Sequence, residues 1–467
     1  MSRRVDLLIV GAGPAGMSAA IAARQYGLDV LVVDEQPAPG GQIWRNIEAV
    51  AGTERAKILG NAYLDGLSTV RKFRASGAVY EPGTQVWQIE SGPRVYMTRD
   101  NTASSVEAGA VLLATGAQER PSPFRGWTLP GVMTVGAAQI SLKSAGQIPE
   151  EPVWIAGTGP LSLLYATQLL KAGGQIAGFL DTTPRGGLLS AMPKFLAAAL
   201  GAPSDLLKGI LWSATLRRRV KYIANVTEIE AIGENSIEQL RYVTKNGKVT
   251  VVNARLLLVH EGLVPTIHPT LALGCLHRWN RDQDSFAAEL DDWGQTSEPN
   301  VFVAGDGAGI GGATAACLRG EIASLGIAVN AGRVDKTEAT RIARPIRARL
   351  KRSLSMRPFL DLLYRPRRSI FVPSDETIAC RCEEVNVAQV RAETKRGGRP
   401  GPNQIKAFTR AGMGPCQGRQ CNYTIAHILA EAEGRDAPDV GVYRVRPPFK
   451  PVTLNELAGL NAKDPCQ

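Results

Sequence analysis

The sequence of 467 residues has few aromatic residues, few histidines and no long apolar run free of glycine and proline. Only 6% of its residues are aromatic and four are histidines. Its longest uncharged run, residues 152–170, is interrupted by two glycines and a proline, whereas a membrane span needs about 20 predominantly apolar residues. We therefore expect no transmembrane segment. At about 150 residues per domain, the length excludes a small disulfide scaffold and predicts roughly three domains.

The seven cysteines are unevenly distributed. Four of them, Cys380, Cys382, Cys416 and Cys421, fall in one C-terminal stretch. An odd total with clustered members indicates metal ligands in a reducing compartment, so we expect a cytoplasmic protein, with peripheral membrane association left open. Residues 1–335 contain no Cys-x-x-Cys or Cys-x4-Cys pair, which argues against disulfide reduction.

A dinucleotide-binding pattern begins near the N-terminus. An apolar strand over residues 5–10 leads into Gly11-x-Gly13-x-x-Gly16, a helix over 17–26 follows, and a second strand ends at Asp34. In such a unit the first glycine makes the tight turn, the second admits a pyrophosphate and the third allows the helix to pack on the strand. The acid lies 23 residues after Gly11, which suits binding of a ribose diol.

Two later strands end in short polar motifs. Residues 108–116 end in Thr115-Gly116, and residues 299–306 end in Gly305-Asp306 before a helix rich in small residues. Asp306 is thus predicted at the carboxyl end of a strand, where α/β folds bind ligands.

The pattern recurs in the middle of the chain. A strand over 153–156 precedes Gly157-x-Gly159-x-x-Ser162, and a second strand ends at Asp181. The repeat predicts a second dinucleotide domain inserted into the first. An acid there favours a ribose 2′-hydroxyl over a 2′-phosphate, and hence NADH or an adenine nucleotide over NADPH. A domain that keeps this fold without a working nicotinamide site is equally compatible.

Together these motifs, over residues 5–330, resemble the flavoprotein disulfide reductase superfamily. The resemblance implies that FAD is bound by the first unit and by the later strand ends. His260 follows a strand that ends near the flavin side of such folds, where it would tune the flavin or act as an acid or base; we favour instead a structural histidine at a domain boundary. The residues assigned to FAD are Gly11, Gly13, Pro14, Ala15, Gly16, Asp34, Glu35, Gly41, Gln42, Ala114, Thr115, Gly116, Gly305, Asp306, Ala313 and Thr314. Those assigned to the second nucleotide, NAD or ATP, are Gly157, Gly159, Ser162 and Asp181.

The C-terminal cysteines form two close pairs, Cys380-x-Cys382 and Cys416-x4-Cys421. Four cysteines match the ligand count of an iron–sulfur cluster or of structural zinc, but Cys-x-Cys is too tight for an ordinary zinc knuckle. Residues 376–440 resemble the bacterioferritin-associated-ferredoxin type of [2Fe-2S] domain, with a longer second spacing. The resemblance implies that all four cysteines are cluster ligands. Helices are expected over 386–394 and 422–432.

The predicted fold class is α/β, with two Rossmann-like domains and a small, mostly helical C-terminal domain. The predicted segments are a split FAD domain (1–118 and 290–335), an inserted NAD- or adenine-nucleotide-type domain (119–289), a basic connector (336–372), a [2Fe-2S] domain (373–445) and a C-terminal tail (446–467).

Residues 34–43, 114–121, 126–134 and 260–265 carry a closer resemblance. They resemble the larger FAD subunit of opine oxidases, D-hydroxyproline dehydrogenase and dye-linked proline dehydrogenase, and the middle subunit of hydrogen cyanide synthase. The resemblance implies an electron-transfer subunit whose glycine-oxidase-like FAD partner carries the substrate site, with a small ferredoxin-like subunit in some complexes. The alternative is a self-sufficient NADH-dependent oxidoreductase. No catalytic residue and no nucleic-acid partner is predicted.

The basic charge is concentrated in one segment. Residues 341–368 hold ten basic residues and one acid, and so carry +9 of the net charge of +11. Three interpretations stay open for this segment: a solvated linker, a docking site for an acidic partner protein, or a segment that contacts a membrane surface or nucleic acid.

Overall fold

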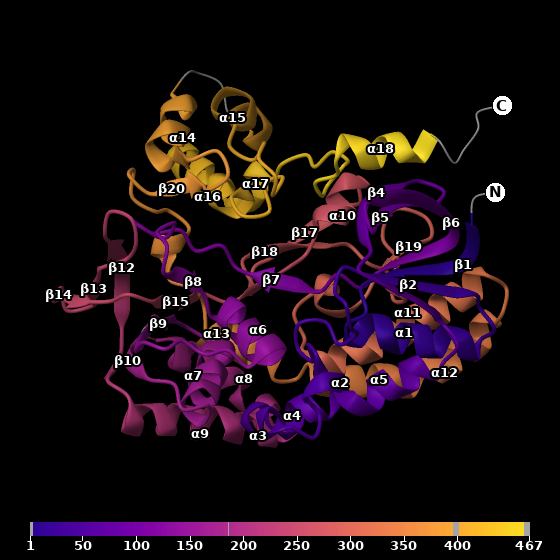
Figure 1. Ribbon diagram of the computed structural model, residues 1–467, viewed down its shortest axis with the longest axis horizontal. Helices are drawn as coiled ribbons and strands as arrows, with labels where there is room; N and C mark the ends of the chain where they lie inside the picture. Colours follow the sequence, from indigo (N-terminus) through magenta and orange to yellow (C-terminus); the bar gives the residue numbers. More distant parts are fainter. Residues whose placement is uncertain (1–2, 185, 396–400, 462–467) are drawn as a thin grey trace. The chain divides into compact units, whose positions relative to one another are not determined.

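The computed structural model describes residues 3–184, 186–395 and 401–461 (Figure 1). The chain forms two compact units. The first contains Met1–Gln118, Val264–Ser355 and Val445–Gln467, and the second contains Glu119–Leu263 and Met356–Arg444.

The first unit is built on a seven-stranded sheet with the strand order β3-β2-β1-β6-β5-β4 and with β19 paired to β6. The strands are β1 (Arg3–Val10), β2 (Val30–Asp34), β3 (Val79–Pro82), β4 (Gln85–Glu90), β5 (Arg94–Arg99), β6 (Thr102–Leu113) and β19 (Val301–Val303). β1, β2, β3, β6 and β19 pair in parallel. The apolar runs of β1, β2, β6 and β19 are largely buried, as parallel strands covered on both faces require, whereas β3, at the edge of the sheet, is partly exposed.

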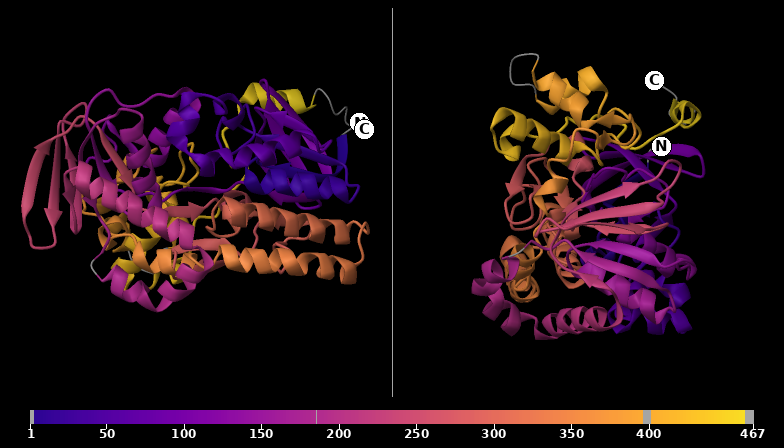
Figure 2. Two further views of the ribbon diagram at one scale, coloured as in Figure 1. Left: turned by 90° about the horizontal axis from the view of Figure 1, so that it is seen from below. Right: turned by 90° about the vertical axis from the view of Figure 1, so that its left-hand side faces the viewer.

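Helices pack on this sheet in layers. α1 (Pro14–Gln25) connects β1 to β2 and begins with a proline, whose fixed φ suits the first helical position. α11 (Ala313–Asn330) lies against α1, where the Ser324 hydroxyl donates to the Ala19 carbonyl at 3.0 Å. α12 (Lys336–Ser353) runs beside α11 (Figure 2) through buried Ala339 and Ala343.

The remaining elements of this unit are short. They are α2 (Ile47–Val50), α3 (Glu54–Leu59), α4 (Asn61–Leu64), α5 (Gly66–Arg74), α10 (His268–Ala272), β17 (His277–Asn280), β18 (Ser285–Ala288) and the 3-10 helix η1 (Gly305–Ala308). β7 (Ala117–Glu119) and β16 (Leu263–Pro265) pair where the chain passes between the units.

The second unit repeats the Rossmann pattern in a parallel five-stranded sheet with the order β11-β10-β9-β15-β8. Its strands are β8 (Val132–Thr134), β9 (Val153–Gly157), β10 (Ile176–Asp181), β11 (Tyr222–Ile223) and β15 (Leu257–His260), with helices α6 (Val135–Ala145) and α7 (Pro160–Lys171). An antiparallel sheet of β12 (Val226–Ile232), β13 (Gln239–Thr244) and β14 (Val249–Asn253) adjoins it. The two sheets confirm the predicted α/β class.

The crossover from β10 to β11 contains two helices, α8 (Gly187–Gly201) and α9 (Pro203–Arg219), which meet at a bend of 117°. α8 packs on α13 (Arg357–Leu363) through Ala191, Ala198 and Phe359. Among the described helices, none alone is long and apolar enough to cross a membrane, although the bent pair α8–α9 meets that test of length and composition together.

The basic connector is not one free linker. Its first half forms α12 in the first unit and its second half forms α13 and the 3-10 helix η2 (Arg368–Ile370) in the second. Many of its arginines bind within their own unit: Arg341 pairs with Glu338, Arg347 lies over the Trp293 ring, Arg357 pairs with Asp361 and Arg367 pairs with Glu261. At least four of the ten basic residues of this segment are therefore engaged within the unit to which they belong.

The cysteine-bearing region belongs to the second unit. Its elements are β20 (Ile378–Cys380), β21 (Val385–Asn386), α14 (Val387–Thr394), α15 (Pro402–Thr409), α16 (Asn422–Glu433) and α17 (Ala437–Val440), which confirms the two helices expected there. The Trp127 indole donates to the Ile378 carbonyl at 2.7 Å, and the Arg367–Glu261 pair is almost fully buried at 2.8 Å. These contacts join the region to the inserted nucleotide domain.

The C-terminal segment returns to the first unit. The Phe449 amide donates to the Trp87 carbonyl at 2.9 Å, and Lys450 forms an ion pair with Glu35. α18 (Leu454–Asn461) follows.

The contact between α1 and α11 depends on a glycine. A Cβ added at Gly320 would overlap the Ala15 carbonyl oxygen. We expect Gly320→Ala to lower the free energy of unfolding by about 1–3 kcal/mol, because the helices must separate. The matched variant Gly209→Ala, in an open part of α9, should instead stabilise by about 0.5–1 kcal/mol. Differential scanning calorimetry compares the two, and a stabilised Gly320→Ala variant would contradict the packing argument.

Candidate functional site

The glycine loop after β1 is set by backbone packing. At Gly11 (φ +107°) a Cβ would lie 2.6 Å from the Ala114 carbonyl oxygen, and at Gly16 it would overlap the Gly11 carbonyl. Gly13 differs, because the nearest atom to a Cβ there is the Gly41 Cα, at 3.7 Å. The fold itself thus requires Gly11 and Gly16, whereas the room at Gly13 is left over for a ligand.

The N-terminus of α1 has the features of an anion-binding site. Its N-cap, Gly13, makes no side-chain hydrogen bond, and the first turn contains no acid. The loop after β2 closes on this end, because the Gly40 amide donates to the Ala12 carbonyl at 2.9 Å and Gly41 approaches Gly13. Uncapped amides at a helix N-terminus bind phosphate groups, so the cradle fits a pyrophosphate.

Asp34 ends β2 beside this loop. Its carboxylate accepts hydrogen bonds from the Ala12 amide at 2.5 Å and the Gln36 amide at 2.7 Å. Burial raises the pKa of Asp34, and the two amides oppose that rise. Arg45, which the sequence did not single out, donates to Gln42 at 3.0 Å and also binds Gln36. The sequence offered one sign of this role: Arg45 follows Gln42, a residue predicted to bind FAD, by only three positions.

The third segment, around Asp306, folds back onto α1. The Asp306 carboxylate accepts from the Gly311 amide at 2.8 Å and the Gly312 amide at 3.0 Å. A Cβ at Gly305 would lie 2.9 Å from the Ala15 Cβ. The first unit therefore holds together the three segments predicted for FAD, including Thr115-Gly116, which follows β6 and lies beside Gly307 of η1, and Ala313-Thr314 at the start of α11.

Arg319 fixes this third segment and was not predicted. Its guanidinium donates to the Gly305 carbonyl at 3.0 Å and to the Gly309 carbonyl. Burial lowers the pKa of Arg319, while the charge of Asp306 opposes that change. Only the fold brings Arg319, in the second turn of α11, back to the loop that bears Asp306.

The second glycine motif forms a similar turn in the second unit. A Cβ at Gly157 would overlap the His260 carbonyl, which accepts from the Thr158 amide at 2.9 Å. The Gly159 N-cap of α7 has no side-chain hydrogen bond. Ser162 is fully buried and donates to the Gly159 carbonyl at 2.8 Å, so serine replaces the third glycine without an unpaired hydroxyl.

Asp181 differs from Asp34 in its partners. Its carboxylate accepts from the Thr183 amide at 2.9 Å and from the Tyr222 hydroxyl at 2.5 Å. Tyr222 stacks on Phe179 with ring centroids 5.3 Å apart, and burial, then the charge of Asp181, raises its pKa. The Tyr222 side chain thus engages the Asp181 carboxylate, which a bound ribose diol would otherwise use. No local sequence pattern predicted this role of Tyr222.

His260 is held by a carboxylate. Its Nδ1 lies 2.7 Å from Glu119 Oε1, and Glu119 Oε2 accepts from the Gly136 amide at 2.9 Å. Both side chains are buried or nearly so. The geometry agrees with a structural role for His260.

The four clustered cysteines lie as two hydrogen-bonded pairs, Cys380 with Cys421 and Cys382 with Cys416. Cys380 and Cys421 are buried, and Cys382 is exposed. The hydrogen bond from Cys421, together with amides such as that of Gly412, lowers the pKa of Cys380 to about 6. Among the residues that the structure describes, no three His, Cys, Asp or Glu side chains converge on one metal-ion position. The four cysteine sulfurs are thus arranged as two pairs.

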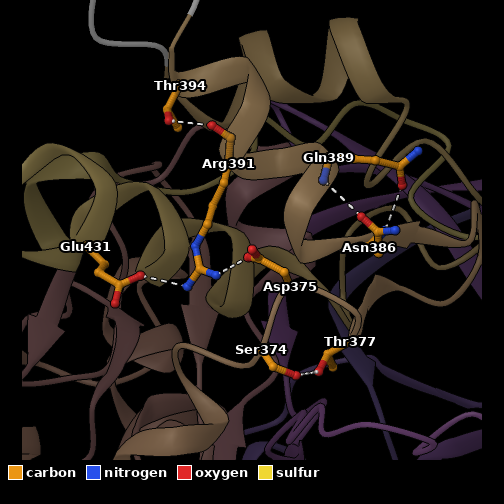
Figure 3. Close-up of polar contacts among 8 residues, drawn as sticks. All are labelled: Ser374, Asp375, Thr377, Asn386, Gln389, Arg391, Thr394 and Glu431. Carbon is orange, nitrogen blue, oxygen red and sulfur yellow. Dashed lines mark hydrogen bonds and ion pairs between the residues drawn. The ribbon is translucent and has the colours of Figure 1, made fainter.

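Arg391 links the two halves of the cysteine region (Figure 3). It pairs with Asp375, shortly before β20, and with Glu431 of α16 at 2.9 Å. β20 ends at Cys380, and α16 begins directly after Cys421. The arginine therefore ties together the two elements that carry this cysteine pair, and Asn386 and Gln389 cap α14 beside it.

We expect Arg319→Ala to weaken binding of FAD, the dinucleotide that the resemblance implies, by about tenfold or more. Each hydrogen bond from a charged group is worth about 1.5–3 kcal/mol, and their loss frees the loop that bears Asp306. Quenching of flavin fluorescence measures the affinity. Arg347→Ala, which removes an arginine bound to the Asp292 carbonyl of the same unit, is the control. Equal affinities would contradict the positioning role.

Comparison with known proteins assigns the family. The pyridine nucleotide-disulphide oxidoreductase family matches residues 5–332, and the sarcosine oxidase A3 domain matches residues 380–460. The crystal structure of L-proline dehydrogenase from P. horikoshii superposes with a TM-score of 0.69 at 19% identity, over 98% of this chain and 80% of that one. This likeness shows a shared fold.

Two curated relatives match nearly end to end. Hydrogen cyanide synthase subunit HcnB of Pseudomonas aeruginosa is 32% identical over 98% of this chain and 99% of its own length. An opine oxidase subunit from Agrobacterium tumefaciens is 43% identical over 97% of this chain and 92% of its own length. Together with the two nucleotide-type sheets, these matches confirm the resemblance found in the sequence: the chain belongs to the family of FAD-dependent oxidoreductase subunits that includes those of opine oxidase and hydrogen cyanide synthase.

Proposed function

We propose that this chain is the FAD and [2Fe-2S] electron-transfer subunit of a multi-subunit amino-acid or imino-acid dehydrogenase or oxidase. The observation that carries the proposal is the combination, in one chain, of a dinucleotide cradle and a cysteine region with donors in two pairs. Flavin exchanges two electrons with an organic donor, and a [2Fe-2S] cluster carries one at a time. The two groups together provide a two-to-one electron relay.

The first unit would hold FAD through its backbone. The α1 amides would bind the pyrophosphate, and Asp34 would accept from the ribose. Asp306, positioned by Arg319 and by the Gly311 and Gly312 amides, would lie at the ribityl chain. These residues bind and orient the cofactor, and none of them is assigned an acid–base role.

The cysteine region would hold the cluster. Two thiolates for each of two irons is the donor set of a [2Fe-2S] centre, and the two pairs supply it. The Gly412 amide donates to the Cys380 sulfur at 3.4 Å, and amide hydrogen bonds to thiolates stabilise an anionic centre. The buried pair, Cys380 and Cys421, would shield part of the centre from water.

Any ATP or NAD at the second nucleotide site would bind without passing hydride to the flavin. The Tyr222 hydroxyl engages one oxygen of Asp181, which leaves less of this carboxylate for a ribose diol and so weakens NADH binding there. This arrangement disfavours the alternative, a self-sufficient NADH-dependent oxidoreductase.

The substrate would be oxidised elsewhere, on a glycine-oxidase-like FAD subunit that passes electrons to this chain. Relatives that match this chain nearly end to end are named as subunits of an opine oxidase and of hydrogen cyanide synthase. We infer an opine, hydroxyproline or proline-like substrate, a further partner in the form of a small ferredoxin-like protein, and a cytoplasmic location in which the cysteines stay reduced.

Anaerobic reduction separates the two functions. NADH added to the isolated chain should leave the visible flavin absorbance nearly unchanged, because hydride transfer is slow when the donor is not held close to the flavin in a reactive orientation. The same flavin in the assembled complex should bleach when an amino-acid or imino-acid substrate is added. Rapid bleaching by NADH alone would overturn the electron-transfer proposal in favour of the self-sufficient enzyme.

Removal of one buried cysteine tests the cluster. Cys421→Ala should abolish bound iron and acid-labile sulfide, because one iron loses a ligand, while FAD stays bound to the first unit. Iron analysis, sulfide assay and electron paramagnetic resonance of the dithionite-reduced protein measure the loss. The control is Cys275→Ala, which removes a buried cysteine outside the cluster region. Full iron and sulfide in Cys421→Ala would reject this cysteine as a ligand.

A further inference from the structure

The crossover helices α8 and α9 expose an unusual amount of apolar surface. Of the 19 large hydrophobic side chains exposed among the described residues, nine lie on these two helices. Leu189 and Leu200 are 78% and 72% exposed. The nine, here called the α8–α9 face, are Leu188, Leu189, Met192, Phe195, Leu196, Leu200, Leu207, Ile210 and Leu211. Clustered exposed apolar residues of this kind mark interaction sites.

The face is firmly supported by the body of the second unit. On the opposite side of α8, Ala191 and Ala198 are fully buried against α13, whose Phe359 is also buried. On α9, Leu216 is fully buried. The exposed residues are therefore the outer side of packed helices, with their partners within the unit already satisfied on the inner side.

The charges on α8 and α9 are predominantly basic. Lys194 and the run Arg217–Arg219 are exposed. Asp205 is the one acid between residues 186 and 219, and it pairs with Lys208 at 2.9 Å. The basic connector is less available, because several of its arginines pair with acids of their own unit. An apolar centre with a basic rim is complementary to an apolar patch with an acidic rim.

We propose that the α8–α9 face docks the companion substrate-oxidising subunit, through an apolar patch bordered by acidic residues. The inference rests on the proposed function, which requires such a partner. A lipid surface is an alternative occupant that the test below separates from a protein, since the lack of a single spanning helix among the described residues concerns membrane spans and not binding to a surface.

The test uses the full chain. A tagged chain is purified from its native host, and its stoichiometric companion flavoprotein is identified by mass spectrometry and used as the probe. In the triple variant Leu189→Glu, Leu196→Glu and Leu200→Glu, the affinity for this companion should fall at least tenfold while FAD and iron are retained. The control pair is Val249→Glu with Val251→Glu, which changes exposed residues of the same unit on β14 and should leave the affinity unchanged.

A second, milder variant keeps the proposal testable if the triple variant does not fold. Arg218→Glu with Arg219→Glu reverses the rim charge without touching the apolar residues, and should weaken docking several-fold, with a steeper loss at low salt. Unchanged affinity in either variant overturns the inference.

The remaining outcomes also discriminate. If no companion copurifies with the unaltered chain, the proposed function fails. If the companion binds the triple variant normally, only the docking inference fails. Flotation of the unaltered chain with phosphatidylcholine–phosphatidylglycerol vesicles, lost in the triple variant while the complex persists, would assign the face to lipid. A dimer of this chain that the triple variant alone dissociates would assign it to a second copy. Either result overturns the proposal.

Discussion

The close approach of backbone to backbone around α1 is the constraint on which the FAD-type site depends. Gly11 packs on Ala114, Gly16 on the turn that precedes it, and Gly320 of α11 on Ala15. Each position lacks room for a Cβ, so β6, α1 and α11 meet at van der Waals distance. Because β6 leads into Thr115-Gly116 and η1 precedes α11, this one packing arrangement brings together three segments that lie far apart in the sequence.

The second nucleotide domain shows that a shared fold does not fix a shared site. Both glycine loops turn sharply at the end of a parallel strand, and both acids end the next strand. Asp34, however, is held by two backbone amides, whereas Asp181 shares one oxygen with the Tyr222 hydroxyl. The βαβ geometry is thus kept in both units, and the chemistry differs through one side chain that arrives from β11. Function therefore has to be argued from the site, not from the fold.

Much of the candidate site followed from the order of motifs along the chain. The glycine loops, the acids at the strand ends, the four cysteines and the helices beside them are all local patterns, and the fold class and family inferred from them are confirmed. Arg319, Tyr222 and Arg391 were missed, because each acts on residues that only the folded chain brings near. Arg45 was missed although its partner Gln42 lies only three residues away. Arg391 illustrates the limit: in sequence it is one arginine among many, and in the structure it joins the segment before β20 to α16.

The sequence by itself determined where the basic charge lies, and the tertiary structure decided what that charge does. Composition placed most of it in residues 341–368, with a linker, a docking site or a contact with a membrane surface or nucleic acid as the interpretations. The fold divides that segment between two units and pairs several of its arginines internally, while α8 and α9 carry the exposed apolar face. The physical reason is that a charge count is additive along the chain, whereas pairing and exposure depend on which surfaces folding covers.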